Sequence, residues 1–461
     1  MTQLPTATSA SSTRLSDLPP AGQAALRAGV VGNWIDNIHV FLPLTALAPA
    51  MFALAGPTTA ASTAALVVVA MLFGRPLGGL IFGRLSDRFG RTRTTRIAIG
   101  GTAACALAIA LLPTYEVLGT GTIISMLTLR FLGGIFVAGQ YSAAIPLAME
   151  WSTPRRRGLM SGLILSMAPW AQASIALAVA LLLMVLGPDA YAVWGWRILF
   201  VIGALLSVGL LIYYGRQVTD APIFDRKVQR ELEQPAKPRA RLRDMLVGSW
   251  APAFWQVFLL MTGLWLLTNS TVLLLTARLA TDTGLSDTRV SVTIGIATIA
   301  QALVMAVAGH LSTYLGRRRL FVMWGLGAML VAPIIWRLAI TSSSLGQAIL
   351  CTAVLQVITV AAYGPVSAYL SERFPTEVRS TGYGMGYSLS LVLPALYPFY
   401  LPLIEPVLGR HGSVMAMVAL GGGLVVLGAL LGPRLAPREI DQELDVVAAK
   451  FAAGQHKGVL S

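Results

Sequence analysis

Residues 83–93 read GRLSDRFGRTR, and residues 309–319 repeat that pattern as GHLSTYLGRRR. Each stretch has two glycines seven residues apart, and an arginine follows the second glycine directly. These residues are Gly83, Gly90 and Arg91 in the first stretch and Gly309, Gly316 and Arg317 in the second. Long apolar runs flank both stretches. A pattern that recurs in the same surroundings predicts that one half of the chain is a copy of the other.

A second pair of matching stretches follows the first. Residues 150–158 read EWSTPRRRG, and residues 372–382 read ERFPTEVRSTG. In both, an arginine comes seven residues after the glutamate, with a proline between them: Glu150 with Arg157, and Glu372 with Arg379. Two matching pairs in the same order support an internal duplication.

The composition indicates a membrane protein. Of the 461 residues, 56% are hydrophobic and only 12% are charged, which is too little polar material to cover a soluble globule. A spanning helix needs roughly 20 mainly apolar residues, and about twelve such runs can be counted. They start near Gly29, Ala61, Thr94, Thr122, Leu159, Trp194, Pro252, Val290, Leu320, Leu345, Thr381 and Val414. The expected fold is therefore all-α, with twelve transmembrane helices divided six and six.

One long polar segment separates the two sets of apolar runs. Its basic residues are interleaved with acids and with the prolines of QPAKP, which is typical of a solvated linker. The expected organisation is a disordered N-terminal tail (1–26), a six-helix bundle (27–216), a linker (217–247), a second six-helix bundle (248–435) and a C-terminal tail (436–461). The N-terminal tail lacks the apolar core of a secretory signal.

The net charge of +14 follows from basic residues that gather in alternate loops. Arginines crowd residues 84–96, 155–157 and 317–319, as well as the linker and both tails, whereas the intervening loops carry little charge. Lys and Arg stay on the cytoplasmic side during insertion. We therefore expect both termini in the cytoplasm, and the charge needs no nucleic-acid partner.

Nothing in the sequence points to catalysis. Cys105 and Cys351 lie in apolar runs far apart, and the four histidines show no HxxxH pattern. We recognise no paired nucleophile and base, and no phosphate-binding loop. We therefore expect no metal, no cofactor and no enzymatic activity. The same lack of motifs disfavours the alternative of a membrane enzyme or a sensor.

The loop motifs resemble a known family. GRLSDRFGRTR is similar to the signature of the major facilitator superfamily, between spans two and three, and GHLSTYLGRRR to its weaker echo between spans eight and nine. Further pieces resemble the metabolite:proton symporters, which take up organic acids and zwitterions: RFLGG from Arg130, EWSTPRRRG, GWRILF from Gly195, DAPIF from Asp220 and FPTEVRSTG from Phe374. The resemblance implies two pseudo-symmetric bundles that rock around one central site, in a monomer in the inner membrane.

The repeated loops are expected to form gates. Asp87, beside Arg88 and Arg91, can cap backbone donors of a facing helix and pair with arginines, and rocking must break this contact. Thr313 stands where the second copy would need its acid, so that half should close more weakly. The expected gating residues are Gly83, Asp87, Arg88, Gly90, Arg91, Glu150, Arg157, Gly309, Gly316, Arg317, Glu372 and Arg379.

The first span carries the candidate proton carriers. Asp36 and His39 stand three residues apart and share a helix face. Comparable symporters have a glutamate at the position of Asp36, an aspartate at that of His39 and a glutamate at that of Gln140. A histidine can still carry a proton.

Few charged residues lie within the spans. Within the spans, the positive charges of Arg75 and Arg130 are balanced only by the negative charge of Asp36, so spare positive charge is expected in the interior. The planar fork of an arginine side chain suits a carboxylate. Other candidate substrate-binding residues are the polar or aromatic side chains at mid-span depth: Gln140, Tyr141, Trp170, Gln172, Trp265, Asn269, Gln301, Gln356, Tyr363 and Tyr387.

The expected function is proton-coupled symport of a small organic anion, such as a carboxylate, by alternating access. A proton-driven exporter is one alternative, disfavoured because the fifth span, LILSMAPWAQASIALA, has no GPxxGG-like motif. Because His39 and Gln140 replace acids, a uniporter or an anion exchanger is the other.

Overall fold

The first six-helix bundle occupies the N-terminal half of the computed structural model, which describes residues 15–56, 60–233, 242–434 and 436–457. Its spans are α1 (Pro20–Thr45), α3 (Ala60–Phe89), α4 (Arg91–Ala110), α6 (Thr120–Trp151), α7 (Arg157–Ala190) and α8 (Trp196–Gln217). Helix α1 begins inside the segment 1–26 that we expected to be disordered. Residues 20–26 (PAGQAAL) are mostly good helix formers, and proline suits the first turn of a helix. Residues 1–14 of that tail lie outside the described ranges.

The second bundle has more broken helices. Its first span is α11 (Ala251–Thr268), which continues through a π-helical turn at Asn269–Leu274 into α12 (Leu275–Asp282), and its second span is α13 (Asp287–Leu315). The third span is α14 (Arg317–Leu330) followed by α15 (Ala332–Ile340), and the fourth is α16 (Leu345–Val360) followed by α17 (Val366–Arg373). The fifth consists of α18 (Arg379–Leu389), α19 (Val392–Ala395) and α20 (Tyr397–Leu408), and the sixth is α21 (Arg410–Leu431). The α14–α15 span bends by 44°, and the α18–α20 span bends by 45°.

The number of spans agrees with the sequence. Among the described residues, eight helical segments are long and apolar enough to cross a membrane, or ten if each bent pair is one span. One of the eight, Pro154–Gln217, contains both α7 and α8, and α4 is the remaining helix of the first bundle. The all-α fold with twelve spans in two bundles is therefore confirmed.

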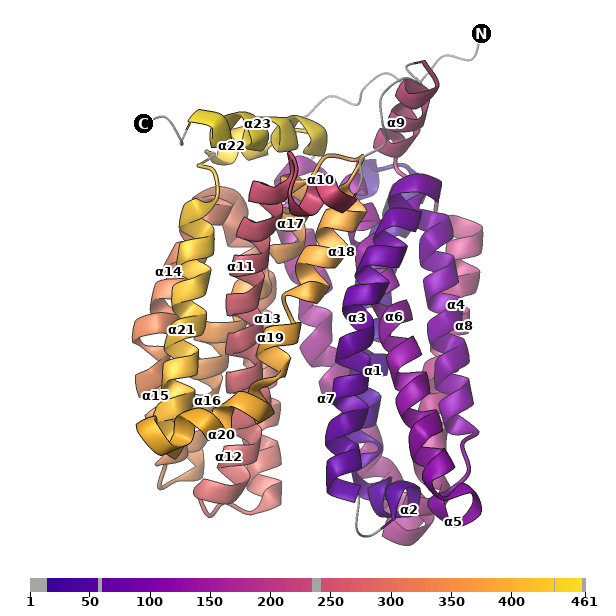
Figure 1. Ribbon diagram of the computed structural model, residues 1–461, viewed down its shortest axis with the longest axis vertical. Coiled ribbons are helices and arrows are strands. Elements are labelled where there is room, and N and C mark those ends of the chain that lie inside the picture. Colours follow the sequence, from indigo (N-terminus) through magenta and orange to yellow (C-terminus); the bar gives the residue numbers. More distant parts are fainter. Residues whose placement is uncertain (1–14, 57–59, 234–241, 435, 458–461) are drawn as a thin grey trace.

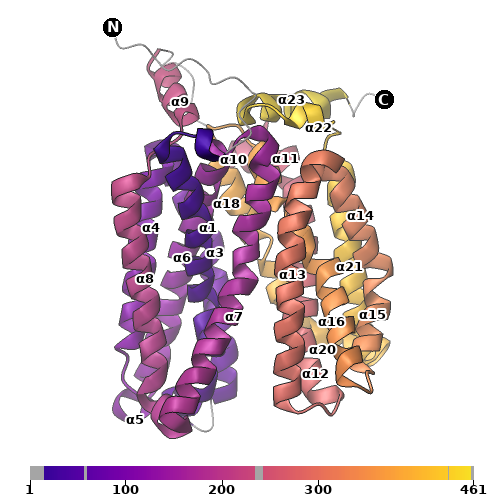
Figure 2. The ribbon, with the colours of Figure 1, turned by 180° about the vertical axis from the view of Figure 1, so that it is seen from behind.

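The two ends of the molecule differ. The start of α1 lies at the same end as α9 (Pro222–Glu233), α10 (Leu242–Leu246), α22 (Pro437–Ile440) and α23 (Leu444–Lys457), as Figures 1 and 2 show. We call this end the terminal face. Helices α2 (Met51–Ala55) and α5 (Tyr115–Leu118) lie at the other end, the opposite face.

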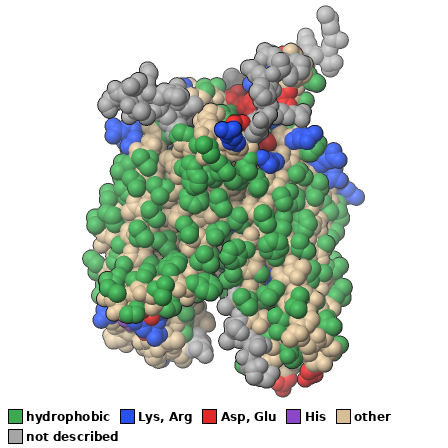
Figure 3. All heavy atoms as spheres, viewed as in Figure 1, with side chains coloured by type: hydrophobic (Ala, Val, Ile, Leu, Met, Phe, Trp, Pro, Cys, Tyr) green, Lys and Arg blue, Asp and Glu red, His purple; other side chains and the backbone are tan. Residues whose placement is uncertain are grey.

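The outer surface is apolar. Figure 3 shows hydrophobic side chains over the flanks of both bundles and charged side chains near the ends. Large apolar residues such as Leu177, Met184, Leu303 and Val407 are exposed. Hydrocarbon chains of lipid cover such a surface without cost. Between the bundles the molecule is hollowed at the opposite face (Figure 3).

The bundles meet near the terminal face, where α3 packs against α18 and α7 against α13. Two motif glycines permit this approach. A Cβ atom at Gly83 would lie 2.7 Å from the Cα atom of Thr381, and one at Gly309 would lie 2.5 Å from the carbonyl oxygen of Gly158. Any larger residue at these two positions would push the bundles apart.

Candidate functional site

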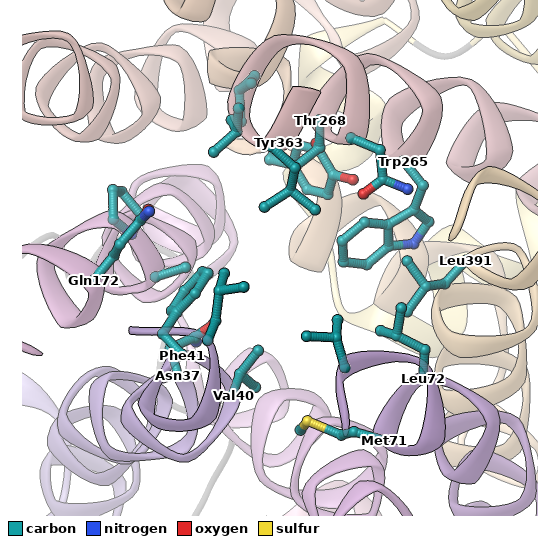
Figure 4. A pocket seen from close by; sticks show the side chains of 18 of the residues that line it. Asn37, Val40, Phe41, Met71, Leu72, Gln172, Trp265, Thr268, Tyr363 and Leu391 are labelled. Carbon is teal, nitrogen blue, oxygen red and sulfur yellow. The ribbon is translucent and has the colours of Figure 1, made fainter. Parts of the chain in front are cut away.

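A cavity of about 170 Å³ lies between the two bundles. In Figure 4, Asn37, Phe41 and Gln172 approach it from the first bundle, and Trp265, Thr268 and Tyr363 from the second. Its wall is largely apolar, with Val40, Leu72, Val272, Leu273, Met305 and Leu391 among the lining residues. The cavity therefore brings residues that are distant in the sequence around one small space.

The only charged residues in the described lining are Arg75 and Arg130. Arg75 on α3 lies among three aromatic rings. Its Cζ atom is 5.1 Å from the ring centre of Tyr141, 5.7 Å from that of Trp265 and 5.8 Å from that of Tyr387. A guanidinium over aromatic rings is stabilised by their quadrupoles. We call these three rings the aromatic box.

The rings hold one another as well as Arg75. The ring centres of Tyr141 and Tyr387 are 5.0 Å apart in a stacked arrangement, and Trp265 meets Tyr387 edge-on at 5.2 Å. Trp265 Nε1 donates a hydrogen bond of 2.9 Å to the carbonyl oxygen of Tyr387. Tyr141 belongs to the first bundle, whereas Trp265 and Tyr387 belong to the second. The box therefore spans the boundary between the bundles.

Both arginines keep unused donors. Arg75 is 3% exposed, and its Nε and Nη2 atoms have no hydrogen-bond partner in the described part of the chain. Arg130 Nη1 donates to the carbonyl oxygen of His39 at 3.2 Å, and Nη2 donates to Met71 Sδ at 2.7 Å. Its Nε atom has no partner among the described residues. These donor atoms are themselves buried, and two guanidinium groups with unpaired donors beside a cavity favour a ligand with acceptor oxygens.

Asp36 and His39 lie buried behind the cavity wall, outside its described lining. His39 Nε2 is 2.7 Å from Ser207 Oγ on α8. The charges of Asp36 and Arg75 lie close enough to interact, and Asp36 Oδ1 has no hydrogen-bond partner among the described residues. Each of the two residues is therefore linked to a lining arginine, Asp36 to Arg75 by charge and His39 to Arg130 through its carbonyl oxygen.

The cavity contains most of the candidate residues named from the sequence. Its lining includes Arg75, Arg130, Tyr141, Gln172, Trp265, Asn269, Gln301, Tyr363 and Tyr387. Three candidates lie elsewhere. Gln140 donates to Thr102 Oγ1 at 3.1 Å inside the first bundle, Gln356 is buried outside the lining, and Trp170 is 37% exposed.

Two polar lining residues were not predicted. Asn37 donates to Tyr141 Oη at 2.9 Å and so links α1 to the aromatic box. Thr268 lies beside Asn269, at the end of α11. The polar run around Asp36 pointed to the neighbourhood of Asn37, but sequence spacing alone does not say which polar side chain of a run faces the cavity.

The terminal face is closed by the first copy of the repeated loop. Asp87 Oδ1 accepts a hydrogen bond from the Ser380 amide at 3.0 Å, and Asp87 Oδ2 accepts from the Thr381 amide at 2.9 Å and from Thr381 Oγ1 at 2.7 Å. The carboxylate thus caps the start of α18, across the bundle boundary. Arg91 lies 3.2 Å from Asp87. This is the capping arrangement that the sequence predicts for Asp87.

Two buried glutamates each join one arginine from each bundle. Glu150 lies 3.1 Å from Arg91 and 2.7 Å from Arg379 of the second bundle. Glu372 lies 2.9 Å from Arg317 and 3.4 Å from Arg157 of the first bundle. The two triads follow the internal repeat, since each bundle supplies one glutamate and sends one arginine to its neighbour.

Three further gating candidates have different places. Gly90 and Gly316 adopt φ angles of +98° and +87° and turn the chain into α4 and α14, a conformation open to glycine. Arg88 lies outside the triads, with its Cζ atom 4.9 Å from the ring centre of Phe89. Arg88 is therefore a surface residue beside the gate.

The comparisons with known proteins agree with this architecture. A family model described as "Major Facilitator Superfamily" matches residues 38–398. The "Inner membrane metabolite transport protein YhjE" of Escherichia coli is 28% identical, with 88% of this chain and 93% of the relative covered. The "Glycine betaine/proline/ectoine/pipecolic acid transporter OusA" of Dickeya dadantii is 30% identical, with 81% and 76% covered. The "Alpha-ketoglutarate permease" of Escherichia coli is 26% identical, with 79% and 82% covered.

A solved structure shares the fold. The proton:xylose symporter XylE superposes with a TM-score of 0.76 at 16% identity, covering 94% of this chain and 99% of XylE. The family model spans most of the chain, and the twelve spans, the paired loops and the central cavity fit it. The chain belongs to the Major Facilitator Superfamily and is a multi-pass membrane transporter, not an enzyme.

Proposed function

We propose that the chain is a proton-coupled symporter that takes up a small organic anion, specifically a carboxylate. The observation that carries this proposal is the charge of the cavity: its described lining holds two arginines and no acid. An organic anion would supply the missing acceptors, and a cation would be repelled. The alpha-ketoglutarate permease among the relatives is named for a carboxylate.

The carboxylate would bind at Arg75, which would turn its unpaired and buried Nε–Nη2 edge toward the cavity. That edge offers two parallel donors, which match the two oxygens of a carboxylate. Arg130 keeps a single unused donor and adds positive potential. Tyr141, Gln172, Trp265, Asn269, Gln301 and Tyr363 would line the rest of the site.

The proton would bind at Asp36, with His39 beside it. When Asp36 is ionised, its charge offsets that of Arg75 and weakens the attraction for substrate. When Asp36 is protonated, Arg75 is free to bind the carboxylate. Proton and substrate therefore favour each other, which is the thermodynamic requirement for symport.

Transport also requires that the cavity open to one side of the membrane at a time. In the described conformation the ion-pair triads close the terminal face, while the molecule is hollowed at the opposite face. Arginines gather at the terminal face, and Lys and Arg stay on the cytoplasmic side. We assign the terminal face to the cytoplasm, so that this conformation faces outward, in a monomer of the inner membrane.

The test uses purified protein in vesicles with a trapped pH dye. Carboxylates, zwitterions and cations are added without an imposed gradient. We expect a carboxylate to acidify the lumen only when the protein is present, and Arg75→Gln to abolish the signal. Accumulation of labelled substrate without a dye response would replace symport by uniport or anion exchange. Substrate efflux driven by an inward proton gradient, without uptake, would identify an exporter.

A further inference from the structure

The aromatic box bears on whether the substrate carries a positive charge. Clusters of aromatic rings are typical sites for quaternary ammonium groups. One relative is named for glycine betaine, which carries such a group together with a carboxylate. In this chain the space among Tyr141, Trp265 and Tyr387 contains the guanidinium of Arg75. The site of a substrate cation is already filled by a cation of the protein.

Several buried polar atoms of the lining residues have no hydrogen-bond partner. Among the described residues they include the donors Arg75 Nε and Nη2, Arg130 Nε and Asn269 Nδ2, and Tyr363 Oη, which can donate or accept. A ligand that satisfies them must bring acceptors. An ammonium or guanidinium group brings only donors or charge, and this lining holds two arginines and no acid to compensate a further positive charge.

The donors also limit the number of carboxylates. Arg75 has an unpaired two-donor edge, which is buried in this conformation, whereas Arg130 uses Nη1 on the His39 carbonyl and Nη2 on Met71 Sδ. A second carboxylate would have to share one Nε donor of Arg130, and burying a charge with so few partners is costly. One ionised group is what this cavity can satisfy fully.

The remaining wall fits an apolar body. Phe41, Val40, Leu72, Val272, Leu273 and Met305 surround the space beside Arg75. An apolar cavity of about 150 Å³ can hold one benzene ring. The present volume of about 170 Å³ is of that order. A ring with a single carboxylate would fill it and leave no polar group of its own unpaired.

We propose that the substrate is a ring-bearing monocarboxylate without positive charge, bound with its carboxylate on the free edge of Arg75 and its ring against the apolar wall, while Arg75 occupies the aromatic box and excludes cationic and zwitterionic compounds. This inference rests on the proposed function, because it narrows the class of anion that the same cavity takes.

Four probes separate the features of the ligand. Benzoate has a ring and one carboxylate, succinate has two carboxylates and no ring, glycine betaine has a carboxylate and a quaternary ammonium, and phenyltrimethylammonium has a ring and a cation. Their binding to the purified full chain is measured by titration calorimetry, which avoids passive leak of benzoic acid across vesicles. We expect benzoate to bind at least about tenfold more tightly than the other three.

Substitution of the box cation makes the test sharper. In Arg75→Gln we expect benzoate binding to fall by about 100-fold, since the two-donor edge is lost. We also expect phenyltrimethylammonium to gain affinity, because the rings are vacated. Arg75→Lys is the matched control: it keeps the charge without the fork, so benzoate should weaken while the cation gains nothing. Each variant is first checked for a single symmetric elution peak.

The outcomes distinguish the two proposals. Tighter binding of succinate than of benzoate by the unaltered chain would overturn the ring-bearing class and leave carboxylate transport standing. Tighter binding of glycine betaine would overturn the exclusion of zwitterions. Failure of every carboxylate to bind, together with a silent pH dye, would remove the proposed function itself. Because the comparison of probes uses the unaltered chain, it decides the matter even if Arg75→Gln does not fold.

Discussion

The two copies of the gate loop have kept the same glutamate triad but differ in the cap. In the first copy Asp87 accepts three hydrogen bonds from the start of α18. In the second copy Thr313 lies in the matching place, where its one described side-chain hydrogen bond comes from Arg317 at 3.4 Å. The two copies therefore share the ion pairs of the triads, but only the first has an acidic cap. The α3–α18 contact should close more firmly than the α7–α13 contact.

The first copy also has support from outside the spans. Asp220 Oδ1 accepts from the amides of Arg91 and Thr92, both at 2.8 Å, and so caps α4. Asp445 on α23 lies 2.7 Å from Arg379 and accepts from the Thr376 amide at 2.9 Å. The linker contacts the side with the stronger cap, and the C-terminal segment contacts both sides, since the Gln442 carbonyl accepts from Arg157 Nη2 at 3.0 Å.

The largest effect on this comparison is expected from removing the cap. Asp87→Ala leaves the first amides of α18 without their charged acceptor, so closure of the terminal face should lose about 1.5–3 kcal/mol. The matched change Thr313→Ala should cost less than about 0.5 kcal/mol. Spin labels at exposed Arg84 and Glu377, on cysteines in a Cys105→Ser, Cys351→Ser background, report the distance between the bundles. An equal shift in both variants would refute the asymmetry.

An added acid should make the two copies alike. Thr313→Asp places a carboxylate near Arg317 and the start of α7, because a Cβ at Gly158 would contact the Thr313 hydroxyl. We expect closure to gain about 1 kcal/mol and the transport cycle to slow severalfold. Thr313→Asn controls for size without charge. The uptake rate and the same spin-label distances measure both effects, and unchanged values in Thr313→Asp would show that the second copy has no need of a cap.

The third expected effect lies at Asp445, outside the spans, and concerns stability rather than transport. Burial disfavours its charge, but Arg379 and the Thr376 hydrogen bonds outweigh burial and hold the pKa of Asp445 below its ordinary value of 3.8. A depressed pKa stabilises the folded state above that ordinary value, and the contribution is lost as the pH falls through the lower, folded-state pKa. Asp445→Asn should therefore lose about 1 kcal/mol at neutral pH. Thermal unfolding followed against pH should show the variant and the parent chain converging below about pH 4, and a constant gap there would contradict this role.

The sequence predicts the fold and the cap formed by Asp87 well, for physical reasons. Apolar runs of membrane-spanning length leave few alternatives to a helix, because lipid offers no partners for the backbone. The spacing of glycines and charges in residues 83–93 and 309–319 marks a tight turn between spans, and Asp87 and Thr313 are local differences that a repeat exposes directly.

The cavity is harder to predict because its residues come together from distant spans. Arg75 was recognised as a spare charge, but the rings around it come from α6, α11 and α18, and no sequence spacing relates those helices. Gln140 and Gln356 lie at the right depth yet outside the lining. The position of a residue within its apolar run gives its depth, whereas its direction depends on how each helix is rotated by packing.

Because the two triads exchange arginines, neither half of the chain can change these charged residues independently of the other half. Arg157 of the first bundle reaches Glu372, and Arg379 of the second reaches Glu150. A charge reversal on one side leaves a buried ion uncompensated on the other, which is strongly destabilising. A chimaera that joins one bundle of this chain to the other bundle of a distant relative should fold only where both of these ion pairs between the bundles are retained. The two halves, although they resemble copies, therefore behave as one unit.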